Sequence, residues 1–168
     1  MKQISLEKAY LKFIPYLLVF VISYDEKNKR PSGMIAGWNM NVSFEPYLFA
    51  VSLWEKGYTH KLIRKCKEFV IAIPNKKLEK AVTVFGSFHG DTVDKFKKSK
   101  IKTLKSKFIK PPLLKDATLN LECKLYKEIK SGDHIIFIGK VLAAYANKGK
   151  KTLVNMGLVN DKHIFREF

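Results

Sequence analysis

The chain has 168 residues, of which 46% are hydrophobic and 28% are charged, and its formal net charge is +17. This length suits one well-buried domain, and the composition excludes a disordered or low-complexity protein. We therefore expect residues 1–168 to form a single globular domain.

The most apolar N-terminal run is FIPYLLVFVISY, from Phe13 to Tyr24. It contains Pro15 and is shorter than the roughly 20 residues that span a bilayer, so we predict a buried strand. Met1 to Lys12 does not resemble a signal peptide, because Glu7 and Lys8 stand where its apolar region would begin. These features predict a cytoplasmic protein that does not associate with a membrane.

Two further strands are predicted by short runs rich in Val, Ile and aromatic residues, LFAVSLW at 48–54 and EFVIAIP at 68–74. A charged glycine turn lies between them and leads into a short helix, for which we expect Thr59 to be the N-cap. Leu62, Ile63 and Cys66 share one face of this helix. The backbone N–H groups of such a helix start can hold an anion.

A second helix is predicted to begin at the N-cap Asn75 and to end at Gly86. Its apolar side chains follow the helical spacing i, i+3, i+4 and i+7 and are Leu78, Ala81, Val82 and Phe85. Asp91 is expected to cap another short turn through DTVDKF, before Pro111-Pro112 prevents any helical continuation.

The C-terminal third contains two long β patterns. ATLNLECKLYKEI, from Ala117 to Ile129, alternates apolar and polar residues and predicts a half-buried strand. HIIFIGKVLAAYA follows a turn at Ser131–Asp133, and its apolar run from Ile135 to Ile138 predicts burial on both faces. A barrel core on one side and a partner subunit on the other would explain that run. The chain is thus predicted to be a mainly β barrel with short peripheral helices, forming a homodimer.

Several kinds of site are disfavoured by residue spacing. Cys66 and Cys123 lie far apart and form no CxxC pair, and the four histidines lack metal-ligand spacing, so we predict no metal site. No Ser/His/Asp triad, paired-carboxylate site or Walker loop is apparent either.

The segment from Lys95 to Lys110 contains eight lysines and no acidic residue, which raises the possibility of nucleic-acid binding. The whole chain has only three arginines, however, and arginine is the usual residue for bidentate recognition of bases and phosphates. We therefore favour a solvated lysine-rich surface and keep a basic nucleic-acid-binding barrel as an alternative.

Three stretches in order resemble the flavin reductase-like proteins, including the flavoredoxins. The first runs from Pro31 to Pro74 and contains the Met-x-Ala-x-Trp turn, a strand ending near Ser-Leu and a Thr-led helix. The second is the Gly-rich FGSFHGDTVDKF, and the third is SGDHIIFIGKV with its Asp-His strand. The resemblance extends from about Pro15 to Val141.

This resemblance implies a dimeric split β-barrel that binds FMN near the subunit interface. It places one set of residues along the isoalloxazine ring: Met34, Ile35, Ala36, Gly37, Trp38 and Asn39. Small residues there would let the backbone approach the flavin edge. It places Ser52 and the loop from Lys56 to His60 beside the ribityl phosphate, with Lys56, Tyr58, Thr59 and His60 as the loop residues. Leu53 and Trp54, which follow Ser52, are further expected cofactor-binding residues. Lys95 and Phe96 are expected to neighbour the cofactor.

Several of these residues also have a simpler structural explanation. In that explanation Thr59 is a helix cap and nothing more, Trp38 is a core aromatic, and Lys95 is a solvated member of the lysine run. His134 either faces the flavin or the incoming nicotinamide as the catalytic residue, or it only pins a turn through Asp133.

The resulting functional prediction is an FMN-dependent oxidoreductase in which NAD(P)H gives a hydride to flavin N5. Because the cofactor performs the chemistry, no essential acid or base need appear in the sequence. An FMN-containing electron carrier without pyridine-nucleotide reductase activity is the alternative among flavoproteins.

Overall fold

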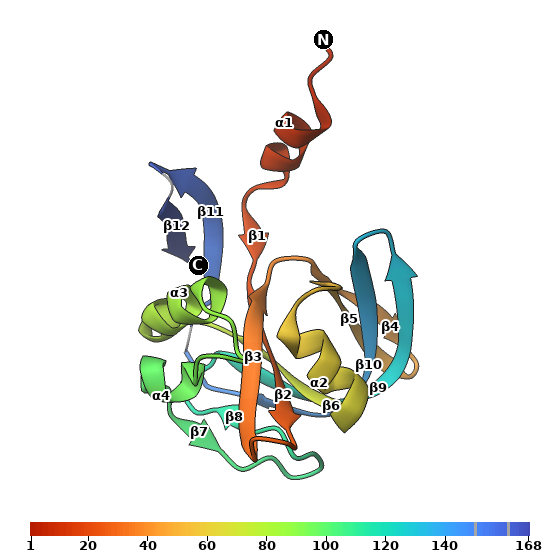
Figure 1. Cartoon of the computed structure of the whole chain (residues 1–168). Helices are drawn as coiled ribbons and strands as arrows, with labels where there is room; N and C mark the ends of the chain where they lie inside the picture. The colour runs from red at the N-terminus through yellow and green to blue at the C-terminus, as the bar shows by residue number, and fades with distance from the viewer. Residues whose placement is uncertain (150, 161) are drawn as a thin grey trace.

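The computed structural model describes residues 1–149, 151–160 and 162–168, which form mainly β-strands (Figure 1). The largest sheet is antiparallel, with seven strands in the order β3-β2-β6-β9-β10-β5-β4. These strands are β2 (Val19–Asp25), β3 (Arg30–Ala36), β4 (Asn39–Phe44), β5 (Tyr47–Trp54), β6 (Glu68–Ile73), β9 (Leu119–Ser131) and β10 (His134–Ala146). The sheet curls so that β3 also contacts β5. The predicted mainly β barrel is confirmed.

Two smaller sheets complete the β structure. One has the order β1-β11-β12 and consists of β1 (Tyr16–Leu17), β11 (Leu153–Val159) and β12 (Lys162–Glu167). The other pairs β7 (Thr103–Leu104) with β8 (Leu113–Leu114). The strand predicted from Phe13 to Tyr24 is therefore divided, because its first residue ends a 3₁₀ turn and its remainder forms β1 and β2.

The helices are short, as predicted, and lie outside the barrel (Figure 1). They are α1 (Leu6–Tyr10), α2 (Tyr58–Cys66), α3 (Glu79–Ser87) and α4 (Lys95–Ser99), with 3₁₀ turns η1 (Leu11–Phe13) and η2 (Lys76–Leu78). Figure 1 shows α1 projecting away from the barrel, and none of its residues is buried. Over the described ranges, no helix has the length and apolar character needed to cross a membrane.

Strands β2 and β6 are buried on both faces, which divides the core in two. Inside the barrel, Val21 and Phe69 pack with Phe137 and with Ile63 of α2. On the other face, Phe20 and its neighbours pack against η2 and α3 through the predicted side chains Leu78, Ala81, Val82 and Phe85. Successive strand residues point to opposite faces, so one strand supplies both clusters.

The predicted helix caps have mixed outcomes. Asn75 caps η2, because its Oδ1 accepts a hydrogen bond from Lys77 N at 3.0 Å. Thr59 is not the cap of α2, which begins at Tyr58 with Gly57 as its N-cap. Since Gly57 has no side chain, the first-turn N–H groups of α2 lack a side-chain cap.

The third cap and one helix end also differ from prediction. Asp94, rather than Asp91, caps α4 by accepting from Lys97 N at 3.0 Å. Asp91 lies in the preceding turn, where its side chain accepts from Thr92 N. Helix α3 ends at Ser87, one residue beyond the predicted Gly86.

The polar residues of β9 correct the prediction of a half-buried strand. Asn120 and Glu122 are buried, although they alternate with the apolar side chains. The Asn120 amide bonds both backbone groups of Leu114, and the Glu122 carboxylate accepts from Lys107 N and Phe108 N. Buried polar groups need such partners, so β9 anchors the loop that covers it.

The two faces of β10 differ within this single chain. Ile135 and Phe137 are buried, whereas Ile136 and Ile138 are half-buried. The inner face is therefore confirmed as barrel core, and burial of the outer face by a partner subunit stays a prediction.

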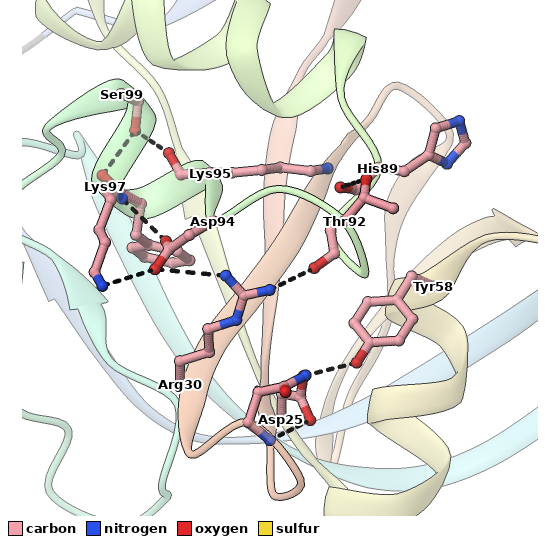
Figure 2. Close-up of polar contacts among 12 residues, drawn as sticks. Asp25, Arg30, Tyr58, His89, Thr92, Asp94, Lys95, Lys97 and Ser99 are labelled. Carbon is pink, nitrogen blue, oxygen red and sulfur yellow. Dashed lines mark hydrogen bonds and ion pairs between the residues drawn. The ribbon is translucent and has the colours of Figure 1, made fainter.

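The lysine segment is exposed at seven of its eight lysines, which confirms the predicted solvated surface for those seven. Lys95 is the exception, with 5% of its surface accessible. Its Nζ donates to the carbonyl oxygens of Gly33 at 2.8 Å and Phe85 at 2.9 Å. Figure 2 shows the side chain extending from α4 into the protein. Burial lowers the pKa of Lys95 to about 8.

Gly139 is expected to tolerate no side chain, because a Cβ there would lie 2.9 Å from Cys123 Cβ and would overlap the Phe69 ring. We predict that Gly139→Ala lowers the free energy of unfolding by about 1–3 kcal/mol. Urea denaturation measures this. Gly86→Ala is the matched control, since a Cβ there meets nothing within 4 Å and alanine favours a helix by roughly 0.5–1 kcal/mol. Equal stability of the two variants would contradict the prediction.

Lys95 should make stability depend on pH. Its pKa falls from 10.5 to about 8 on folding, so between these values the unfolded chain binds more protons and stability rises with pH. Relative to Lys95→Met, the wild type should gain up to about 3 kcal/mol from about pH 8 to pH 10.5. Urea unfolding across this window measures the difference, with exposed Lys102→Met as control. Parallel wild-type and Lys95→Met curves would refute the assignment.

Candidate functional site

The ends of β3, β5 and β10 meet at one end of the barrel. In the β5–β10 register, His134 pairs with Trp54 and Ile136 pairs with Ser52. Ser52 N donates to Trp38 O at 2.9 Å, which joins the residues after β3 to β5. Three segments that are distant in sequence thereby become neighbours.

These segments line a cavity of about 430 Å³. The predicted site residues in its lining are Met34, Ile35, Ala36, Gly37, Trp38, Ser52, Trp54 and His134. The structure thus brings together most of the predicted ring wall, the predicted phosphate neighbour Ser52, the further cofactor-binding residue Trp54 and the predicted catalytic residue His134.

Trp38 forms an open aromatic surface at this cavity. Its side chain is 51% exposed, which excludes the alternative of a core aromatic. The His134 ring lies 4.6 Å from it, centroid to centroid, and the Tyr10 ring stacks on it at 6.0 Å. An exposed indole flanked by two further rings suits the binding of a planar ligand.

Gly37 lines the cavity and also has a packing role that the sequence did not indicate. A Cβ at Gly37 would lie 2.8 Å from Cδ2 of Tyr16, so the Tyr16 ring already occupies the space that glycine leaves. Ala36 is buried in the barrel core, although it also borders the cavity. The small residues at 36 and 37 therefore serve internal packing, and their role beside the flavin stays a prediction.

His134 is held by its neighbour. Its Nδ1 lies 2.7 Å from Oδ1 of Asp133, and the hydrogen bond from His134 lowers the pKa of Asp133. An ionised carboxylate can only accept, so Nδ1 carries the proton of this hydrogen bond, and in the neutral form of the ring Nε2 is an acceptor. The contact with Asp133 pins the turn, as one prediction had it, while the ring also borders the cavity.

Four predicted residues contact other parts of the protein instead of this cavity. The Asn39 amide donates to the carbonyl oxygen of Leu17 at 3.0 Å, and Leu53 is buried in the barrel core. Lys95 binds two backbone carbonyls, as described above. Phe96 packs edge-to-face on Phe85, with ring centroids 5.1 Å apart.

The predicted phosphate loop lies beside the cavity rather than within its lining. Tyr58 donates to Oδ2 of Asp25 at 2.6 Å (Figure 2), and Tyr58 and His60 line a separate cavity. Thr59 is only 3% exposed, and burial lowers the pKa of His60. Lys56, in the same loop, lies next to the first cavity, because its Nζ is 5.9 Å from the centre of the ring of Trp54, which lines that cavity.

Sequence reasoning missed the other wall of the cavity, to which Tyr10, Tyr16, Asn155 and His163 contribute. They come from α1, β1, β11 and β12, and no motif joins these segments. A short polar side chain between apolar residues, as in LVNMG at 153–157, was the one available signal.

The chemical character of the cavity follows from its lining. Among the described residues around it, none is Asp, Glu, Lys or Arg. Its side chains can stack on a ring and exchange hydrogen bonds with it. They offer no carboxylate for acid–base work and, over the described ranges, no His, Cys, Asp and Glu side chains group as a metal site. Such a lining suits a neutral planar group that brings its own reactivity.

Two known proteins are similar in sequence to most of this chain. A protein of Archaeoglobus fulgidus is 39% identical over 114 residues, which are 68% of this chain and 64% of that protein. The NADH-dependent FAD reductase of Streptomyces globisporus is 27% identical over 115 residues, which are 68% of this chain and 62% of the reductase. This chain thus spans less than two thirds of the length of either relative.

A solved structure extends the likeness to the whole fold. The FMN-binding protein of Thermus thermophilus with bound p-hydroxybenzaldehyde superposes with a TM-score of 0.83 at 25% identity, over 99% of this chain and 93% of that one. Residues 11–162 match the profile of the flavin reductase-like domain. This chain therefore belongs to the flavin reductase-like domain family.

Proposed function

We propose that this protein is an FMN-dependent NAD(P)H oxidoreductase. The observation that carries the proposal is the cavity at the ends of β3, β5 and β10, with its exposed indole and its lack of charged side chains. The FAD reductase of Streptomyces and the FMN-binding protein of Thermus, both similar to this chain, support a flavin ligand. Family membership favours this function over a nucleic-acid-binding barrel.

The residues present fit a flavin. The cavity volume of about 430 Å³ falls within the roughly 300–1,000 Å³ of small-molecule sites. Met34 to Trp38 would line the ring, and Ser52 and Trp54 would border its side chain. When bound, FMN supplies a hydride acceptor at N5 and passes the electrons to a second substrate. The side chains around it bind, orient and exclude water.

The phosphate would lie at the start of α2. Backbone N–H groups at a helix start attract anions, and Gly57 leaves those of the first turn without a side-chain cap. Exposed Lys56 lies beside Trp54 and adds a positive charge at the cavity edge. Because Thr59 is buried, its part in binding would come from its backbone N–H.

His134 would position the nicotinamide. With Nδ1 held by Asp133, its Nε2 can accept a hydrogen bond from the carboxamide of NAD(P)H. Fixing the two rings face to face accelerates hydride transfer without any proton transfer by the protein.

A homodimer would cover the exposed apolar side chains of β4 and β5. Met40, Phe44 and Tyr47 are each more than half exposed, and the outer face of β10 adds half-buried Ile136 and Ile138. Contiguous exposed apolar surface of this kind commonly marks a protein interface.

The absorption spectrum of the purified protein tests the proposed function. We expect flavin bands that bleach when NADH or NADPH is added under argon, and chromatography of the released flavin should identify FMN. Bleaching by dithionite alone would instead show an electron carrier. Failure to bind any flavin after incubation with FMN or FAD would refute the proposal.

Replacing His134 distinguishes a role in positioning the nicotinamide from a role in stabilising the turn at Asp133. In His134→Ala we expect FMN affinity to stay within about twofold, because the flavin keeps its ring wall, and hydride transfer to slow by roughly 10- to 100-fold. Stopped-flow bleaching of bound FMN by NADH measures the rate, and the melting temperature reports folding. Asp133→Asn is the control that keeps the ring but weakens its anchor, and an intermediate rate is expected. A wild-type rate in His134→Ala would contradict the assignment.

A further inference from the structure

Tyr16, Asn155 and His163 form a polar cluster at the boundary of two cavities. All three border the cavity described above and also a neighbouring one of about 640 Å³. Asn155 is 1% exposed and lies between the other two. Its Nδ2 is 2.6 Å from the hydroxyl oxygen of Tyr16 and 3.2 Å from Nδ1 of His163.

The direction of each hydrogen bond in this cluster can be assigned. Gly157 N lies 3.0 Å from the Asn155 side chain, and a backbone N–H can only donate, so the contacted atom is Oδ1. Nδ2 is therefore the amide donor to Tyr16 and to His163. Nδ1 of His163 must accept, which places the ring proton on Nε2.

Two donors remain unused as a result. The hydroxyl proton of Tyr16 has no acceptor among the residues that the structure describes, and neither has Nε2–H of His163. Tyr16 is half-buried, and a donor that is partly withdrawn from water gains from an acceptor in the ligand, whereas His163 is exposed at the rim of the cavity. The cluster therefore offers hydrogen-bond donors to whatever occupies the cavity.

The backbone of β11 is shaped to hold this arrangement. The pairing of β11 with β12 is irregular between Asn155 and Leu158, and Gly157 has a φ of 106°. Residues other than glycine are strained in that conformation. Bulges of this type re-aim side chains near functional sites. Here the irregularity turns the N–H of Gly157 onto Oδ1 of Asn155.

We propose that Tyr16 and His163, oriented by Asn155, form a donor pair that binds a carbonyl oxygen in the cavity. The carbonyl belongs either to the pyrimidine ring of the flavin or to a separate carbonyl compound that accepts electrons from it. The first source rests on the proposed function, whereas binding of a separate carbonyl compound does not require it. Asn155 is a positioning residue, because it acts through the two donors.

Two probes and two variants test the donor pair. Riboflavin has no phosphate, so its affinity reports ring contacts, and cyclohex-2-enone has its carbonyl oxygen as its only polar atom. Calorimetry would measure riboflavin binding to the flavin-free protein, and enone binding with and without FMN.

Tyr16→Phe removes one donor and keeps the ring. Asn155→Asp keeps the shape, but its carboxylate would accept the Tyr16 proton. Tyr24→Phe, which removes a hydroxyl outside both cavities, is the control.

We expect Tyr16→Phe and Asn155→Asp each to lower the binding affinity for one of the two probes by about 3- to 10-fold, as the loss of one hydrogen bond predicts. The double variant should be little weaker than either single one, a non-additivity that a general loss of folding would not produce. Weaker riboflavin binding assigns the carbonyl to the flavin, and weaker enone binding assigns it to a separate compound.

The remaining outcomes separate this inference from the proposed function. Wild-type affinity of both variants for both probes would overturn the donor pair and leave flavin binding intact. Absence of flavin binding together with Tyr16-dependent enone binding would overturn the proposed function alone. If the wild type binds neither probe, the donor pair is wrong.

Discussion

The antiparallel register between β5 and β10 is the constraint on which the site depends. It pairs His134 with Trp54 and Ile136 with Ser52, while the other edge of β10 pairs with β9. A slip of one residue would turn Ile135 and Phe137 away from the barrel core, which makes the register costly to change. The burial of two apolar side chains inside the barrel therefore fixes the position of a polar ring at its rim.

Much of the fold could be predicted from local patterns, because burial imposes a period on each strand and helix. The runs at 48–54 and 68–74 became β5 and β6, and the i, i+3, i+4, i+7 set after Asn75 became the buried face of η2 and α3. The polar residues of β9 show the limit of this reasoning. Asn120 and Glu122 alternate as if they faced water, but backbone groups of Leu114 in β8 and of Lys107 and Phe108 form their hydrogen bonds. The alternation within β9 does not report these partners.

The candidate site was predictable only where its residues adjoin in sequence. Met34 to Trp38 form one continuous stretch, and Asp133-His134 is a neighbouring pair. Lys95 was misjudged because seven similar lysines around it are solvated, whereas its burial is set by carbonyl groups of β3 and α3. Tyr16 and Asn155 are 139 residues apart, so only the folded chain brings them together.

Two residues of the cavity lining, His134 and Tyr16, present opposite hydrogen-bonding character. In the neutral form of the His134 ring, Nε2 is an acceptor because Asp133 holds Nδ1–H, and the hydroxyl of Tyr16 is a donor because Asn155 fills its acceptor site. Each polarity is set by a partner that can bond in one direction only, namely an ionised carboxylate and an amide fixed by a backbone N–H. The one charged partner, Asp133, lies outside the lining, so the described residues around the cavity include no ion that would compete with a neutral ring. A planar group with N–H and carbonyl functions along its edge matches such a lining, and that is the character of the flavin pyrimidine and of the nicotinamide carboxamide.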